Sequence, residues 1–416
     1  MKSNKANLLS VVIAGIVAGS PSLANAEAAS ISEAIGGGKV SLDLNLRHEE
    51  VDQPKGDNAA VKADAKALTL RTRMGYTTDS FKGFSYTLSF EDVSVVGGTD
   101  KYKAPPAGLD GPADTAVIAD AEVTEIDQSF LQYKGGMFTA TLGQQVIALD
   151  NQRFVGHVGW RQDRQTFDAL RVVVTPVEKL TVDASYVNRR HRIFAEVADI
   201  NSKDILLNVG YQFGCGKLTG YSYMLEEDQP GAVDNGIDTL GLRFAGSTMA
   251  GETKILYTGE FAKQTNELEG RDDFDTSYMF LEAGAEISGF TAKLGYEVLG
   301  SDDGMGGFAT PLATAHAFNG WADMFLGTPD LGLVDTYVSL GAKVLGGGLT
   351  VVYHDFSADE STDDVDDLGD EIDVVYAKGF AKHYKAGIKF AQYSLGDVYG
   401  KLRDTDKTWL WINASF

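Results

Sequence analysis

The chain has 416 residues, a formal net charge of −23 and one cysteine, Cys215. A single cysteine excludes an internal disulfide. Outside the N-terminus, no apolar run reaches the roughly 20 residues of a membrane-spanning helix. Glycine is abundant, with 47 residues, and proline is scarce, with 9. This composition favours many strands joined by tight turns.

The N-terminus has the pattern of a removable secretory signal. Lys2 and Lys5 are basic, residues 8–18 are apolar, and Ala24-Asn25-Ala26 is a cleavage site of small residues. The apolar run is shorter than the roughly 20 residues that a spanning helix needs. We therefore expect residues 1–26 to be a signal peptide. No linker or change of period divides residues 27–416, so we expect them to form one domain.

The rest of the chain alternates apolar and polar residues, as residues 40–47 show with Val-Ser-Leu-Asp-Leu-Asn-Leu-Arg. A period of two places the apolar side chains on one face of a strand and the polar ones on the other. We predict about 18 strands, an even number as in bacterial barrels. They cover residues 40–47, 68–76, 84–91, 125–134, 137–146, 167–175, 179–192, 204–213, 216–226, 237–247, 252–264, 276–287, 290–299, 333–344, 348–358, 371–379, 384–394 and 407–416.

The connections alternate in length. Short ones include residues 134–136, 175–178, 214–216, 288–289 and 346–348, and long ones include 97–124, 147–166, 300–332 and 359–370. Short periplasmic turns opposite long extracellular loops are typical of outer-membrane barrels, whereas a soluble sandwich has no reason to keep such an alternation. We predict an all-β fold, a transmembrane antiparallel β-barrel in the outer membrane of a Gram-negative bacterium.

The last predicted strand ends in Phe416, which shares a face with Ala414, Ile412 and Leu410. A terminal phenylalanine on an alternating strand resembles the assembly signal of outer-membrane barrels. We therefore expect the barrel-assembly machinery to be a partner, together with outer-membrane lipid and lipopolysaccharide.

Arginines recur on the polar face of the strands, which is the lumen of a barrel. They are Arg47, Arg71, Arg73, Arg171 and Arg189. Arginine stays charged and its planar fork matches carboxylate, sulfate or phosphate, so a ring of arginines can select anions. Alternatively, these arginines form a structural ladder with carboxylates such as Asp43, Glu91 and Asp183. The two interpretations are compatible, and both stay open.

Residues 151–171 form an island of positive charge in an acidic chain. Arg153, Arg161 and Arg164 lie in a predicted connection with Phe154 and Trp160. The loop could fold inward as a constriction or stay outside as a lid. Its aromatic residues favour inward packing, because exposed loops seldom keep such residues together.

Trp160, Trp409 and Trp411 are candidates for stacking on sugar rings. For the last two, a position in the interfacial aromatic belt is an equal alternative. Residues 359–371 hold eight carboxylates and no basic residue. We favour a solvated external loop there over a weak cation or lipopolysaccharide contact. The residue pattern predicts no metal site, no cofactor and no catalytic set.

Three segments resemble the alginate-export family of outer-membrane porins. They are residues 150–169, which begin DNQRFVG, residues 316–329, which begin HAFNGWAD, and residues 90–98, which begin FEDV. The resemblance implies an eighteen-strand barrel with an arginine-lined channel that passes anionic sugar polymers in the best-known branch. One departure is Gln144 after Gly143, where the family often has arginine.

We therefore predict a porin for passive diffusion of small or oligomeric, anionic solutes. One alternative is a dedicated exporter of an alginate-like anionic polysaccharide. Another is a surface-binding barrel whose lumen is plugged. An enzyme is not expected, and neither is a nucleic-acid partner.

Overall fold

The computed structural model describes residues 27–55, 58–104, 109–110, 115–228, 236–267 and 272–416. The predicted signal peptide, residues 1–26, lies outside the described residues.

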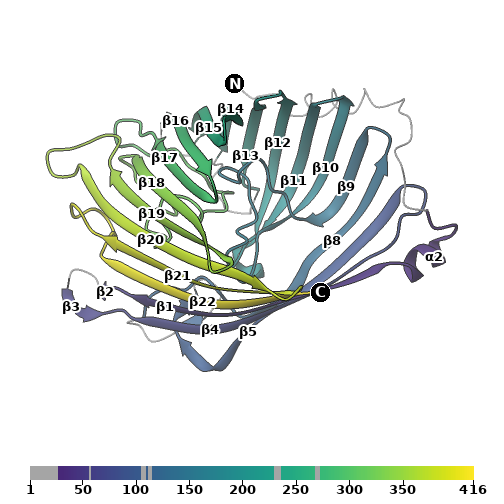
Figure 1. Ribbon diagram of the computed structural model, residues 1–416, viewed down its shortest axis with the longest axis horizontal. Coiled ribbons are helices and arrows are strands. Elements are labelled where there is room, and N and C mark those ends of the chain that lie inside the picture. Colours follow the sequence, from purple (N-terminus) through teal and green to yellow (C-terminus); the bar gives the residue numbers. More distant parts are fainter. Residues whose placement is uncertain (1–26, 56–57, 105–108, 111–114, 229–235, 268–271) are drawn as a thin grey trace.

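Eighteen antiparallel strands form one closed barrel (Figure 1). Each strand pairs with the next one along the barrel, and β22 pairs with β1 to close it, with Leu46 opposite Ile412. The barrel strands are β1 Lys39–Asp52, β4 Ala65–Thr77, β5 Phe84–Lys101, β8 Val123–Gly135, β9 Phe138–Gln145, β10 Thr166–Val177, β11 Leu180–His191, β12 Ile200–Gln212, β13 Gly216–Glu226, β14 Gly236–Ala250, β15 Thr253–Glu267, β16 Phe274–Ile287, β17 Phe290–Leu299, β18 Leu333–Val344, β19 Gly347–Ser357, β20 Asp367–Phe380, β21 Tyr384–Ser394 and β22 Thr405–Ser415.

Short elements lie outside the barrel wall. They are the helix α2 Ile31–Gly36, the 3-10 turn η1 Glu196–Ala198, and the small hairpins β2 Pro54–Lys55 with β3 Asn58–Lys62 and β6 Lys103–Ala104 with β7 Leu109–Asp110. None of the described helices is long and apolar enough to cross a membrane.

The barrel predicted from alternation is confirmed, and each predicted strand overlaps one barrel strand. Several strands are longer than predicted, because alternation continues past the length that crosses a bilayer; β5 has 18 residues. One correction concerns the acidic run 359–371. Only part of it is a loop, since β20 begins at Asp367 and Glu371 is fully buried.

The two ends of the barrel differ in their connections. At the turn end, neighbouring strands join through residues 78–83, 136–137, 178–179, 213–215, 251–252, 288–289, 345–346 and 381–383. At the loop end, the connections include the much longer 102–122, 146–165 and 300–332. The start of β1 and the end of β22 both lie at the turn end, as the pairing of Lys39 with Thr77 and of Tyr384 with Ala414 shows.

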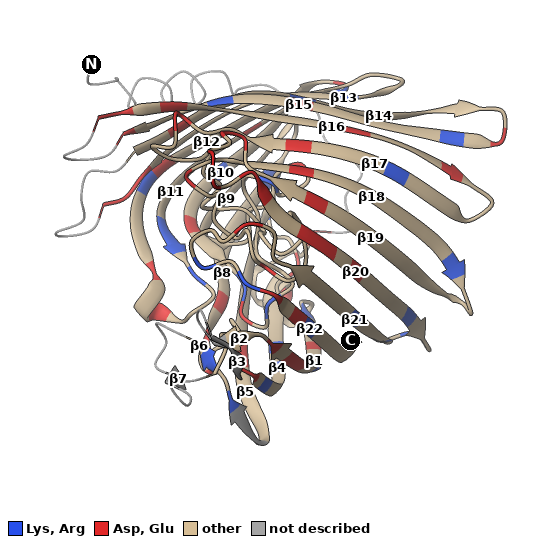
Figure 2. Cartoon of the chain, turned by 90° about the vertical axis from the view of Figure 1, so that its left-hand side faces the viewer, with Lys and Arg blue, Asp and Glu red and all other residues tan. Residues whose placement is uncertain are grey.

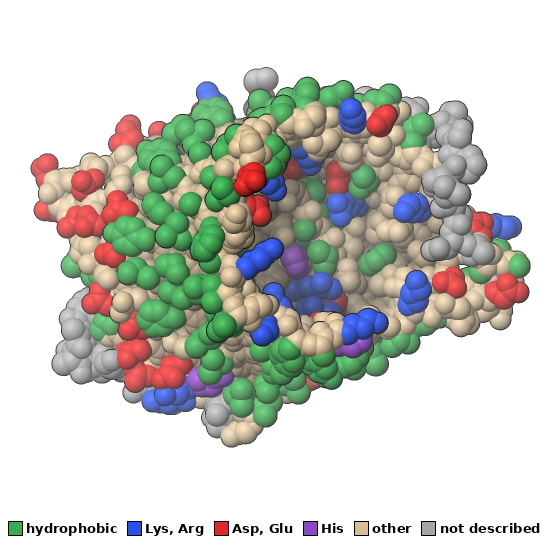
Figure 3. Space-filling view, in the orientation of Figure 1, with side chains coloured by type: hydrophobic (Ala, Val, Ile, Leu, Met, Phe, Trp, Pro, Cys, Tyr) green, Lys and Arg blue, Asp and Glu red, His purple; other side chains and the backbone are tan. Residues whose placement is uncertain are grey.

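The outer face of the wall is apolar, and Figure 3 shows hydrophobic side chains gathered along the flank of the molecule. Leucines with more than half of their surface exposed recur around it: Leu142, Leu240, Leu281, Leu294 and Leu340. Toward the turn end the exposed residues become aromatic, with Phe84, Tyr211, Phe213, Phe290, Phe380, Tyr384 and Phe416. An apolar band bordered by aromatic residues matches a bilayer and its interface, and a water-soluble surface would not tolerate it.

The lumen is partly filled by two loops, which Figure 2 shows as coil enclosed by the strands. Residues 146–165 and 300–332 run inward, and we call them together the plug. Phe154 lies at its centre, with its ring centroid 5.4 Å from Tyr221, 5.0 Å from Tyr278 and 5.7 Å from Phe308. The expected inward packing of the arginine loop is therefore what the structure shows.

Candidate functional site

The chain turns inward at the end of β9. Gly143 has a φ of +122°, and a Cβ there would lie 2.3 Å from the Ser129 carbonyl oxygen, so only glycine fits. The two plug loops then pair with each other. Gly156 N donates to Leu312 O at 2.8 Å, and Thr314 N donates to Gln152 O at 3.0 Å. The plug is thus one hydrogen-bonded body.

Arg153 fastens the plug to the wall. Its Nε lies 2.7 Å from Glu297 Oε1 on β17, and its Nη2 donates to Asn319 Oδ1 at 2.9 Å. Its guanidinium carbon lies 4.8 Å from the Phe318 ring centroid. Only 3% of Arg153 is exposed, so this predicted pore residue is an interior anchor.

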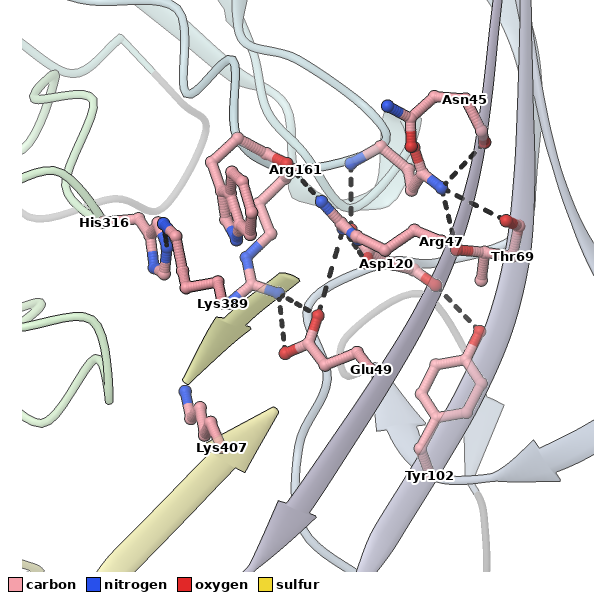
Figure 4. Close-up of polar contacts among 12 residues, drawn as sticks. Asn45, Arg47, Glu49, Thr69, Tyr102, Asp120, Arg161, His316, Lys389 and Lys407 are labelled. Atoms are coloured by element: carbon pink, nitrogen blue, oxygen red, sulfur yellow. Dashed lines mark hydrogen bonds and ion pairs between the residues drawn. The ribbon is translucent and has the colours of Figure 1, made fainter. Parts of the chain in front are cut away.

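Arg161 belongs to a buried group that we call the seam cluster, because it lies inside the junction of β1 and β22. The cluster comprises Arg47, Glu49, Asp120, Arg161, Asp323 and Lys407, most of them drawn in Figure 4. Arg161 reaches Glu49 Oε2 at 3.0 Å and Asp323 Oδ2 at 2.6 Å. Lys407 Nζ also lies 2.9 Å from Asp323 Oδ2.

The seam cluster is charge-paired throughout. Arg47 donates to Asp120, which lies in the loop 102–122, and to the carbonyl oxygen of Trp160, which lies in the plug. Arg47 therefore connects this loop to the plug. Burial raises the pKa of Asp323, but His316, Lys407 and Arg161 outweigh it and hold that pKa well below its usual range. Asp323 therefore stays ionised inside the plug.

Lys389 on β21 occupies an aromatic cage beside the seam cluster. Its ammonium nitrogen lies 3.7 Å from the Trp160 ring centroid and 4.2 Å from that of Trp321. It also lies 2.9 Å from His316 Nε2, whose ring Nδ1 lies 2.6 Å from Asp323 Oδ1. Indole faces attract a desolvated cation, so Lys389 links both plug loops to the wall.

The predicted sugar-stacking tryptophans are inside the barrel, but they pack on one another. Trp160 lies 5.9 Å from Trp409 and 5.4 Å from Trp411, centroid to centroid, and stacks on His316 at 4.8 Å. Trp409 has no exposed surface. These indoles hold the plug, and sugar stacking stays a prediction for the partly exposed Trp160 and Trp411.

A second set of arginines lines the wall itself. We call them the wall pairs: Arg73 with Glu91, Arg164 with Asp127, Arg171 with Asp183, and Arg189 with Asp199. Arg164 comes from the plug, and the other three arginines come from strands. Met74, beside Arg73, is 54% exposed on the outer face, which directs Arg73 inward.

In every wall pair the cation is the more exposed partner. Arg73 is 15% exposed against 1% for Glu91, and Arg164 is 17% against 1% for Asp127. Arg171 is 23% exposed against 13% for Asp183, and Arg189 is 38% against 5% for Asp199. The predicted lumenal residue Arg71 is the reverse, with 10% against 30% for Asp43. In the wall pairs the guanidinium group is therefore the more accessible partner and the carboxylate the more buried one.

Asp163 lies among the carboxyl groups of Glu91 and Glu125. It is 1% exposed, and burial together with Glu125 and Glu91 raises its pKa well above the usual range. This setting favours the protonated form of the carboxyl group. Among the described residues, no group of three or more His, Cys, Asp or Glu is placed to hold a metal ion.

Sequence reasoning missed the residues that receive the plug. Lys389 could have been found, because it lies between Ile388 and Phe390 in the predicted strand 384–394, and a period of two places it on the polar face. Glu49 in β1 and Lys407 in β22 could have been placed on the polar face by the same alternation. His316 and Asp323 had no signal beyond their place in a segment that resembles a family.

The sequence matches the family described as alginate export over residues 88–298, slightly more than half of the chain. No curated protein gives a significant match. Solved outer-membrane proteins of Pseudomonas aeruginosa share the fold. OccK9 (OpdG) has a TM-score of 0.69 at 15% identity, covering 92% of this chain and 99% of its own. OccK8 (OprE) has 0.67 at 14%, covering 92% and 99%. OpdK with vanillate has 0.65 at 13%, covering 91% and 98%.

Proposed function

Because the chain belongs to the alginate export family, and is an outer-membrane porin-type barrel by its fold, we propose that it conducts small or oligomeric anionic solutes by passive diffusion. The exposure of the wall pairs carries this proposal. In each of them the guanidinium is more exposed than the carboxylate that it pairs with. A solute in the lumen would meet the cation first.

Salt screens charges on exposed loops more strongly than charges inside the lumen. Carboxylates on exposed loops are screened within about 8–10 Å at physiological salt, so they have little effect on the pore. Charges inside a narrow lumen are screened less, and low-dielectric walls focus their field on a passing ion. Guanidinium groups also bind carboxylate and phosphate oxygens through two parallel hydrogen bonds.

The lumen retains open space beside the plug. A cavity of about 400 Å³ lies between the plug residues 317–321 and the β14–β19 wall. It is lined by Lys293 and Arg243, which are paired with Glu282 and Glu260. Figure 3 shows the molecule hollowed, with lysine and arginine side chains inside the hollow.

Single-channel recording in a planar bilayer tests the proposal. In a salt gradient the reversal potential should indicate preference for chloride over potassium. Vanillate, which accompanies OpdK in one of the similar solved structures, and a uronic acid oligomer should reduce the current more than neutral sugars of equal size. A cation preference, or equal block by neutral sugars, would contradict the proposed selectivity.

The plug favours one second candidate, a surface-binding barrel with a closed lumen. Its two loops are hydrogen-bonded to each other and charge-paired to the wall. The same recording separates the two functions, since a closed barrel gives no steps of conductance. A dedicated polysaccharide exporter would conduct but would be blocked far more strongly by the polymer than by short oligomers.

A further inference from the structure

The short helix α2 is held firmly against the turn end of the barrel. Ser30 caps it by accepting a hydrogen bond from Glu33 N at 3.2 Å, and Asp79 N donates to Ala34 O at 3.0 Å. The Tyr76 hydroxyl donates to the Ile35 carbonyl oxygen. Six residues cannot form a stable helix alone, so these contacts with residues 76–79 fix its position.

The apolar face of α2 is nevertheless not covered. Ala34 is buried, but Ile31 and Ile35 are 64% and 57% exposed. They lie four residues apart and therefore on one face of the helix. Placing two isoleucines in water on a helix that is otherwise anchored has no benefit for folding. Their setting indicates that something other than water contacts them.

That face forms one side of an apolar crevice of about 530 Å³. The opposite side consists of Phe84 and Tyr86 of β5 and Leu131 of β8, with Tyr86 directly opposite Leu131 in the sheet. Each of these three side chains is at least 40% exposed on the outer face of the barrel. The volume falls in the range of about 300–1,000 Å³ that small-molecule sites occupy.

The position of the crevice identifies its occupant. It continues the apolar band of the outer face and lies at the turn end, where aromatic residues border that band. In outer-membrane barrels this is the depth at which acyl chains meet headgroups, in the leaflet on the periplasmic side. Lys82 stands at the rim of the crevice, and none of the described carboxylates forms an ion pair with it.

We propose that this crevice is a binding site for one phospholipid, with an acyl chain between α2 and the β5–β8 wall and its phosphate beside Lys82. α2 then acts as a clasp that keeps a single lipid on the barrel while the surrounding lipids exchange. The site is separate from the lumen, so its test does not depend on the proposed conductance.

Native mass spectrometry of the detergent-purified full chain tests the site. Titration with phosphatidylglycerol should show one tightly retained lipid per barrel. The double variant Ile31→Asn/Ile35→Asn should weaken that retention about tenfold, since it removes two apolar contacts with the acyl chain. Lys82→Gln should weaken retention of the phospholipid but not of a diacylglycerol with the same acyl chains.

Leu240→Asn/Leu294→Asn is a matched control. These leucines are 68% and 58% exposed on the outer face, as exposed as the two isoleucines, but they lie far from α2 in the barrel order. The control should keep the bound lipid. Heat-modifiable migration on gels should show that both variants stay folded.

Three results would overturn the proposal. One is that the wild-type barrel retains no more lipid than the Ile31/Ile35 variant. Another is that the leucine control loses lipid equally, which would mean general coating of the apolar band. The third is a retained mass that matches a peptide or a second chain in place of a lipid.

Discussion

The seam cluster and the wall pairs place the same side chain, arginine, in two opposite settings. In the seam cluster Arg161 is 6% exposed and contacts two carboxylates that are 1% and 4% exposed. In the wall pairs the arginine is 15% exposed at Arg73 and up to 38% exposed at Arg189. An arginine on the lumenal face is therefore not by itself a pore residue. The exposure of the guanidinium itself separates the anchor from the proposed solute contacts.

Breaking the seam cluster should have the largest effect. Arg161→Met leaves Glu49 and Asp323 buried with one cation fewer, which costs about 3–5 kcal/mol for a buried pair. We expect the plug to detach, with a larger and noisier conductance and faster protease cleavage within residues 146–165. Lys254→Met, at an exposed pair with Glu286 at the turn end, should leave both unchanged. If the Arg161 variant keeps the quiet conductance of the wild type, the seam cluster does not hold the plug.

Neutralising the wall pairs should change selectivity and leave the plug in place. In Arg73→Gln/Arg171→Gln, which changes two strand arginines and no plug residue, the carboxylates of Glu91 and Asp183 lose a cation. The reversal potential should move toward potassium by several-fold in permeability ratio, because lumenal charge is weakly screened. Protease resistance of the plug is the control. An unchanged reversal potential would make these arginines structural, like those of the seam.

The pH response should differ between two carboxyl groups of the plug, Asp163 and Asp323. The raised pKa of Asp163 means that its contribution to stability is complete below its ordinary value of about 4 and is lost as pH rises through the raised value. Protease cleavage of the plug should therefore increase as pH rises above about 4, and Asp163→Asn should flatten that increase. The lowered pKa of Asp323 has the opposite sign, so its contribution persists above about 4 and is lost only in stronger acid. If Asp163→Asn keeps the wild-type increase in cleavage, Asp163 is not its cause.

The smallest effect is expected from the acidic loop. Changing Asp359, Glu360, Asp363 and Asp364 to the corresponding amides removes four charges from the loop end. Screening within about 8–10 Å should leave the reversal potential nearly unchanged at physiological salt. The measurement is the same salt-gradient recording. A shift as large as that of the wall-pair variant would show that the mouth and not the lumen sets selectivity.

Much of this structure follows from local sequence. A period of two predicts the barrel and the inward direction of Arg73 and Arg171, because each strand residue is assigned to a face by its neighbours. The seam cluster could not be predicted in this way. Arg161 and Glu49 are 112 residues apart, and their contact depends on the path of a loop that has no period. The cage around Lys389 is missed for the same reason, since it is made from two loops and two strands.

The plug crosses the junction where the first and last strands meet. Arg161 contacts Glu49 on β1, while the Trp160 ring packs on Trp409 of β22. This docking surface does not exist until the barrel has closed, because its two halves come from opposite ends of the chain. The plug must therefore insert late in biogenesis, and its insertion indicates that the barrel has closed. Once docked, the plug braces the joint from within, so that separating β1 from β22 requires extracting the plug first.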